Sequence, residues 1–155
     1  MQKTQREIIL ESCERAKKRG CGKYINQIIE KKGRGKFTLQ DLLVFDGLYD
    51  PDKIKKEDFY IGEGMSIERS GLIIDFCNII YSSDWYEGAK FDWKSWGLDY
   101  FKNIDLIKDA PIEDIKKMLI VIVRMEHWNN GFVYRAAKRG RISAILNRIK
   151  VGELY

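Results

Sequence analysis

The stretch IEDIKKMLIVIVRMEHW, residues 112–128, decides the fold of this chain. Its apolar residues recur at helical spacing, and the run from 118 to 123 is apolar almost all round a helix. Pro111 precedes the first turn, which contains Glu113 and Asp114, and acidic groups stabilise the positive end of a helix dipole. The sequence therefore predicts a central apolar helix over about 112–128.

Further helices are predicted on both sides of this stretch. Apolar spacings of three and four residues, with glycines or caps at the ends, indicate helices over 5–19, 23–32, 38–47, 70–81, 93–101 and 132–150. Pro51 is expected to begin another short helix, and no segment has the pattern of a long strand. We therefore expect an all-α fold, a compact bundle of about six or seven short helices around the central one.

Length and composition indicate one domain over residues 1–155. A chain of 155 residues can bury one core of ordinary size, and 33% charged residues beside 45% hydrophobic ones are typical of a folded globular protein. No apolar run has the length of a membrane span, and the first 20 residues lack the apolar stretch of a secretion signal. We expect a cytoplasmic protein with no membrane partner.

The sequence contains no signature of a metal or nucleotide cofactor. Cys13, Cys21 and Cys77 are widely spaced and accompany a single histidine, so neither a zinc site nor a disulfide framework is expected. Two Gly-Lys pairs, at 22–23 and 35–36, lack the preceding glycine and the following hydroxyl of a phosphate-binding loop. We expect no cofactor and no metal.

Charge is divided unevenly along the chain. Residues 1–36 carry a net charge of +7, residues 37–110 a net −7, and residues 111–155 a net +5. Basic ends are typical of a protein that contacts phosphates, although pairing between the ends and the middle, or a merely solvated surface, would also account for them. The candidate nucleic-acid-binding residues are Lys31, Lys32, Arg34, Lys36, Arg135, Lys138, Arg139 and Arg141.

Aromatic residues gather between 81 and 101, where their charged neighbours are mainly acidic. Core packing or a protein-contact surface explains such a cluster better than stacking on bases. The candidate interface residues are Trp85, Tyr86, Trp93 and Trp96. The alternative function is therefore a protein–protein interaction module or inhibitor, of bacterial or phage origin and directed against a defence system, that uses segment 85–101.

Glu126 and His127 are the weak catalytic candidates. Adjacent residues of a helix point about 100° apart, so these two do not form an acid–base pair by themselves. An ionic contact at a helix end with a half-buried imidazole explains them better than catalysis does. We therefore place an enzyme third, after a non-enzymatic protein that contacts nucleic acid or a nucleoprotein complex through its basic ends.

Three stretches resemble an uncharacterised bacterial family, domain of unknown function 6508. They are FDWKSW (91–96), VRMEHWNNGF (123–132) and AAKRGRISAILNRI (136–149), with matching residues Arg124, Glu126, Trp128, Gly131, Gly140, Ile142, Leu146 and Arg148. His127 departs from the basic residue expected at its position. The resemblance covers about residues 72–150, leaves 1–70 as a basic extension or subdomain, and implies a compact helical domain without a known activity.

Overall fold

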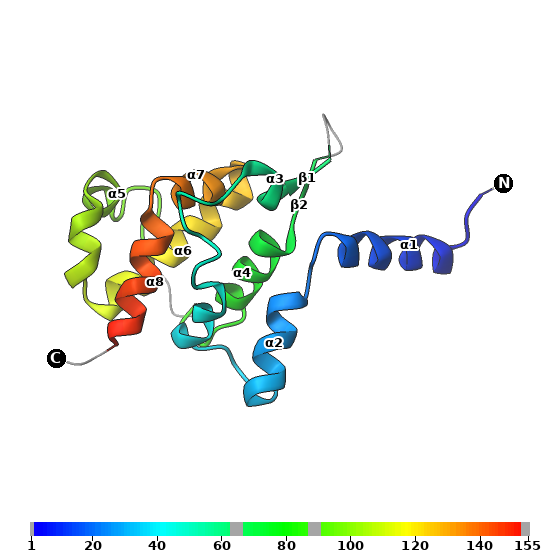
Figure 1. The fold of residues 1–155 in the computed structure, drawn as a ribbon, viewed down its shortest axis with the longest axis horizontal. Helices are drawn as coiled ribbons and strands as arrows, with labels where there is room; N and C mark the ends of the chain where they lie inside the picture. Colours follow the sequence, from blue (N-terminus) through cyan, green and yellow to red (C-terminus); the bar gives the residue numbers. More distant parts are fainter. Residues whose placement is uncertain (1, 63–66, 87–90, 153–155) are drawn as a thin grey trace.

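The computed structural model describes residues 2–62, 67–86 and 91–152, and helices dominate it (Figure 1). The elements, with η marking a 3-10 helix, are α1 (Gln5–Lys18), α2 (Lys23–Lys32), η1 (Leu39–Phe45), α3 (Lys56–Phe59), β1 (Tyr60–Ile61), β2 (Glu68–Arg69), α4 (Gly71–Tyr81), α5 (Leu98–Lys102), η3 (Ile104–Asp109), α6 (Ile112–Trp128), α7 (Phe132–Lys138) and α8 (Arg141–Val151). The predicted all-α class is confirmed.

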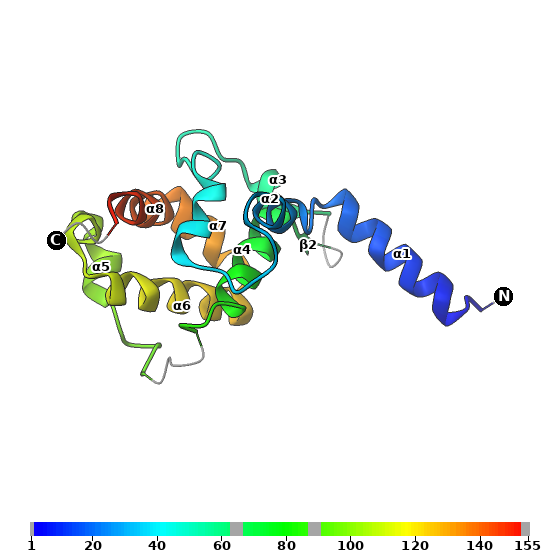
Figure 2. The same ribbon diagram turned by 90° about the horizontal axis from the view of Figure 1, so that it is seen from below.

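Helix α6 is the buried element that the sequence predicts, with the same bounds. Six consecutive residues, 118–123, are buried, which matches their apolar character on every side of the helix. α6 spans the body from α5 to α4, with α7 beside it (Figure 2). The core gathers around it from α4, η1, α7 and α8, and its largest fully buried side chains include Tyr49, Phe45, Phe59 and Phe76.

A small two-stranded antiparallel sheet is the one departure from the all-helical expectation among the described residues. Strands β1 and β2 pair Tyr60 with Arg69 and Ile61 with Glu68. Directly opposed residues of an antiparallel pair extend their side chains from the same face. This pairing therefore brings Tyr60 and Arg69 to one side of the ribbon, although strands of two residues have no readable sequence pattern.

Three predicted helices have different bounds in the structure. Pro51 lies in a turn, and the short helix after it begins at Lys56. The helix expected after Asp92 begins at Leu98, because Gly97 has a positive φ of 79° and interrupts the preceding turns. The segment 132–150 is divided into α7 and α8 by Gly140, whose φ is 80°. A left-handed residue reverses the chain direction, so it ends a helix even where apolar spacing continues.

Helix α1 stands away from the body (Figures 1 and 2). Ile8, Ile9 and Leu10 are each more than half exposed, and no α1 residue among those described belongs to the core or packs against it. Arg19, just after the helix, bonds to the body. Arg19 Nη1 donates to the Arg69 carbonyl at 3.0 Å, and Gly71 N–H donates to the Arg19 carbonyl at 2.8 Å.

Helix α2 starts on a carboxylate that another helix provides. Asp75 of α4 is buried, and its two oxygens accept hydrogen bonds from the N–H groups of Gly22 at 2.7 Å and Tyr24 at 2.9 Å. These N–H groups lie at the positive end of the α2 dipole and have no partner within the helix. Asp75 therefore caps α2 and joins it to α4.

Within residues 2–62, 67–86 and 91–152, no helix combines the length and the apolarity needed to cross a bilayer.

Candidate functional site

Glu126 lies near the end of α6 with its carboxylate buried. Three hydrogen-bond donors contact this carboxylate, and a fourth contacts the backbone carbonyl of Glu126. Its Oε1 accepts from the Tyr60 hydroxyl at 2.9 Å and from Val133 N–H at 3.0 Å, and its Oε2 accepts from Arg69 Nε at 2.8 Å. Arg69 Nη2 also donates to the Glu126 carbonyl at 2.8 Å. The charge is thus paired and hydrogen-bonded, which is the condition under which a protein tolerates a buried carboxylate.

The Tyr60 hydroxyl stays protonated in this network. Burial raises the pKa of Tyr60 well above its usual value, and the neighbouring Glu126 carboxylate raises this pKa further. A phenol held neutral beside a carboxylate acts as a hydrogen-bond donor to it. Tyr60 therefore contributes no negative charge to the surface above Glu126.

His127 follows Glu126 at the end of α6, and Glu126 is buried whereas His127 is exposed. His127 is exposed, and its ring centroid lies 5.2 Å from that of Trp128. The cavity beside His127, between α4 and α6, has a volume of about 130 Å³, well below the roughly 300–1,000 Å³ of small-molecule sites. Glu126 and His127 both line this small cavity, but no hydrogen bond joins the two side chains in the part of the chain that the structure describes, and Glu126 instead joins α6 to the β1–β2 pair.

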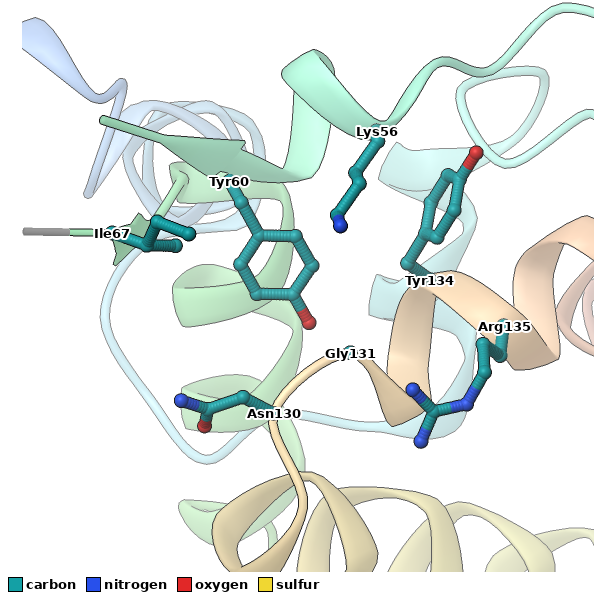
Figure 3. Close-up of a pocket in the computed structure, with 7 residues that line it drawn as sticks. All are labelled: Lys56, Tyr60, Ile67, Asn130, Gly131, Tyr134 and Arg135. Carbon is teal, nitrogen blue, oxygen red and sulfur yellow. The ribbon is translucent and has the colours of Figure 1, made fainter. Parts of the chain in front are cut away.

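An open pocket of about 500 Å³ lies on the other side of Tyr60 (Figure 3). It is formed between α3, β1, the turn after α6 and the start of α7. Lys56 and Arg135 supply positive charge, Tyr60 and Tyr134 supply aromatic rings, and Asn130 supplies an amide. Among the predicted site residues, Arg135 alone lines this pocket, because the others of its cluster lie farther along α7 and α8.

The basic residues around Gly140 make different contacts and do not act as one group. Lys138 Nζ donates to the Pro51 carbonyl at 3.2 Å, and Arg139 is exposed. Arg141 donates to the Phe101 carbonyl and lies over the Phe101 ring, 5.1 Å from its centroid, and burial lowers its pKa. Arg141 therefore fastens α8 to α5, which leaves it less accessible to an external partner than Arg139.

The cluster of Lys31, Lys32, Arg34 and Lys36 covers the last two residues of α2 and the turn after it, and it is exposed. Lys32 is the engaged member, since its Nζ lies 2.6 Å from Asp41 and donates to the Lys36 carbonyl. In Figure 1 this end of α2 and helix α7 lie at opposite edges of the body. The two predicted basic clusters therefore do not form one continuous surface.

Helices α1 and α2 carry further cations that the predicted site residues did not include. The exposed members whose side chains have no carboxylate of the described residues within 4.0 Å are Arg6, Arg15, Lys17, Lys18 and Lys23, beside Lys31, Arg34 and Lys36. The net charge of +7 over residues 1–36 was the signal for them. In the sequence, basic residues cluster over 31–36, and within residues 1–36 the predicted site includes only this cluster. The exposed cations of the structure extend this basic surface along α1 and α2, and we call the whole surface the basic arm.

The aromatic candidates mostly pack inward. Trp85, Tyr86 and Trp96 are half-buried against the core. Arg124 of α6 donates to the Tyr86 hydroxyl at 3.1 Å, and its guanidinium lies 5.5 Å from the Tyr86 ring centroid and 5.7 Å from that of Trp93. Cation–aromatic contacts of this kind hold a segment on a helix face. Trp93 is the one candidate of the four that does not pack against the core, and the predicted interface stays a prediction.

Cysteine and acidic side chains do not assemble into a metal site in the described part of the chain, where no three His, Cys, Asp or Glu groups meet. Cys21 and Cys77 are free thiols. Burial raises the pKa of Cys77 to about 12, so this thiol is protonated at neutral pH.

The chain belongs to the family of unknown function 6508, whose model matches residues 61–153. The match begins earlier than the resemblance indicated and includes both Arg69 and Glu126. Searches of the curated proteins and of the solved structures gave no match. Several positions that carry the resemblance hold the fold together, since Glu126 binds Arg69, and Arg148 donates to the carbonyls of Ala110 and Gly152 at 2.8 Å each.

Proposed function

We propose that this member of the family is a non-enzymatic protein that binds nucleic acid through the basic arm of α1 and α2. The observation that carries the proposal is the set of eight exposed cations, six on these two helices and two in the turn after α2, which have no carboxylate partner among the described residues. Cations that already pair within the protein gain little from a phosphate, whereas free ones neutralise phosphates and release counterions. The arm therefore has the charge needed for contact with a nucleic-acid backbone.

The position of α1 supports the same function. The middle of the sequence is acidic, with a net charge of −7 over residues 37–110, and would repel a polyanion that approached it closely. Helix α1 extends away from the body that contains this segment (Figure 1). The α1 part of the arm can thus meet a backbone while the acidic body stays beyond about one Debye length, roughly 8–10 Å at moderate salt.

Fluorescence anisotropy with labelled single-stranded and double-stranded oligonucleotides tests the proposal. Binding is expected to weaken steeply between about 50 and 200 mM salt, as counterion release requires. In the variant Lys17→Gln/Lys18→Gln, the slope of log affinity against log salt should fall by about 2. The matched control is Lys102→Gln/Lys108→Gln, which removes the same charge from exposed sites in the acidic segment.

The two double variants separate arm binding from a general effect of net charge. If both lose affinity equally, or if wild-type binding is indifferent to salt, the proposal is wrong. Circular dichroism of each variant checks that the fold is retained.

A contact with another protein through segment 85–101 is the alternative proposal. Its support is the half-exposed Trp93, which lies over Arg124 and outside the core. A pull-down from a bacterial lysate with wild type and with Trp93→Ala tests it. Recovery of a stoichiometric partner by wild type only is the expected result, and equal recovery by both excludes this surface.

A further inference from the structure

The pocket between Tyr60 and Tyr134 contains two cations without acidic partners. Neither Lys56 Nζ nor the Arg135 guanidinium has a carboxylate of the described residues within 4.0 Å. Figure 3 shows the Lys56 amine between the two tyrosine rings and the Arg135 guanidinium folded back beneath Gly131. Two unpaired cations that converge on one cavity favour an anionic ligand.

Gly131 holds the Arg135 guanidinium close to the pocket. A Cβ atom added at Gly131 would lie 2.8 Å from Arg135 Nη1, closer than real Cβ contacts allow, and the φ of Gly131 is 99°. The absence of a side chain therefore leaves space that the guanidinium occupies, and the left-handed turn directs α7 so that Arg135 faces back. The guanidinium of the exposed Arg135 thus lies against the Gly131 backbone where it lines the pocket.

The walls of the pocket provide flat apolar surface. Tyr134 packs against Phe59, with ring centroids 5.3 Å apart, and Tyr60 is held through its hydroxyl by Glu126. Both rings are half-buried, so each has one side on the core and keeps other surface toward the cavity. Fixed aromatic rings are surfaces on which a planar heterocycle stacks.

The floor of the pocket does not repel an anion. The Glu126 carboxylate accepts from the hydroxyl of Tyr60, which lines the pocket, and Arg69 neutralises this charge at 2.8 Å. Tyr60 stays neutral because burial and Glu126 both raise its pKa. Asn130 accepts a hydrogen bond from Arg69 through its Oδ1, which leaves its amide N–H groups as donors.

We infer that this pocket binds one nucleotide unit, with its phosphate on Lys56 and Arg135 and its base against the tyrosine rings. The cavity volume of about 500 Å³ lies within the roughly 300–1,000 Å³ of small-molecule sites. The unit can come from a free mononucleotide or from the phosphorylated end of a strand. The inference does not depend on the basic arm, because no residue of α1 or α2 lines the pocket.

Isothermal titration calorimetry with AMP, adenosine and inorganic phosphate tests the inference on the full chain. AMP is expected to bind. Adenosine and phosphate should each bind at least about tenfold more weakly, because adenosine lacks the phosphate and phosphate lacks the base. A 5′-phosphorylated dinucleotide is titrated in parallel. Tighter binding of the dinucleotide than of AMP identifies a strand end as the source, and the reverse identifies the free nucleotide.

Arg135→Gln and Arg139→Gln are the matched variants, since both remove one guanidinium near the end of the same helix and Arg139 lies outside the pocket. Arg135→Gln should weaken AMP binding at least about tenfold, and Arg139→Gln should change it less than about twofold. Thermal unfolding checks that both variants fold. Failure of AMP to bind wild type, phosphate binding equal to AMP binding, or equal losses in the two variants would each overturn the inference.

The Lys17→Gln/Lys18→Gln variant distinguishes this inference from the proposed function. It should lose affinity for oligonucleotides and retain wild-type affinity for AMP. A loss of AMP binding in this arm variant would place the nucleotide contact outside the pocket.

Discussion

Arg69 Nε and Glu126 Oε2 lie 2.8 Å apart, although 57 residues separate them in the sequence. The carboxylate is buried, and the guanidinium is about one-third exposed. This pair joins the end of α6 to the β1–β2 hairpin, and the Tyr60 hydroxyl and Val133 N–H complete the coordination of the carboxylate.

Replacement of Glu126 by glutamine should destabilise the protein by about 3 kcal/mol, because it leaves Arg69 without its charge partner and places an amide N–H₂ against existing donors. Glu113→Gln is the control, since it makes the same substitution on the same helix in the exposed pair with Lys116, where a loss below about 0.5 kcal/mol is expected. Urea unfolding measures both. Similar losses would show that the buried network contributes no more than a surface pair.

Asp75→Asn should weaken the start of α2. The amide presents one acceptor oxygen where the carboxylate presents two, and its N–H₂ group faces the Gly22 or Tyr24 N–H. We expect a loss of about 2 kcal/mol and faster hydrogen exchange at these two amides. Asp109→Asn, at an exposed position, should leave both measurements unchanged. Unaltered exchange at Tyr24 in Asp75→Asn would contradict the capping role.

Gly71→Ala should disturb the junction between α1 and the body. An added Cβ would lie 2.1 Å from the Gly20 carbonyl oxygen and 2.4 Å from the carbonyl carbon, so backbone must move. A cost of roughly 2 kcal/mol or more is expected in urea unfolding. Gly35→Ala serves as the control, because nothing lies within 4 Å of its added Cβ. Equal stability of the two variants would show that the 19–22 segment shifts freely.

Stability should fall at alkaline pH. Burial raises the pKa of Cys77 from 9.0 to about 12, and burial also raises that of Tyr81 from 10.0 to about 12. Because both folded-state values exceed the unfolded ones, the contribution is complete below about pH 9 and is lost as pH rises to about 12, by up to roughly 1.4 kcal/mol per pH unit for Cys77. The contribution of Tyr81 is smaller, because this side chain is 39% exposed and solvent screens its charge.

Urea unfolding at several pH values between about 8 and 11 measures this slope. Cys77→Ala should be less stable at pH 8, since it leaves a small cavity, yet lose less stability toward pH 11 than wild type. A parallel decline in the two proteins would show that the Cys77 thiol does not contribute to the alkaline transition.

The sequence by itself determined those elements that depend only on residues close together in the chain. Helix α6 has its predicted bounds because apolar residues on every side require burial whatever the neighbours are. The start of η1 has a capping box, with Thr38 N–H donating to Asp41 Oδ2 at 2.8 Å, and its groups are only three residues apart in the sequence. The resemblance to the family also rested on the local stretches 91–96, 123–132 and 136–149, and the family model matches residues 61–153.

Only the tertiary structure decided what the charged residues do. Asp75 caps a helix more than 50 residues away, and Arg69 and Tyr60 meet Glu126 through a sheet two residues long. Arg135 and Arg141 belong to one basic cluster in the sequence, yet Arg135 lines a pocket and Arg141 binds the Phe101 carbonyl. The local spacing of apolar residues predicts which helix a charged side chain belongs to. The partner of that side chain depends on how distant segments pack, and the partner determines what the charge does.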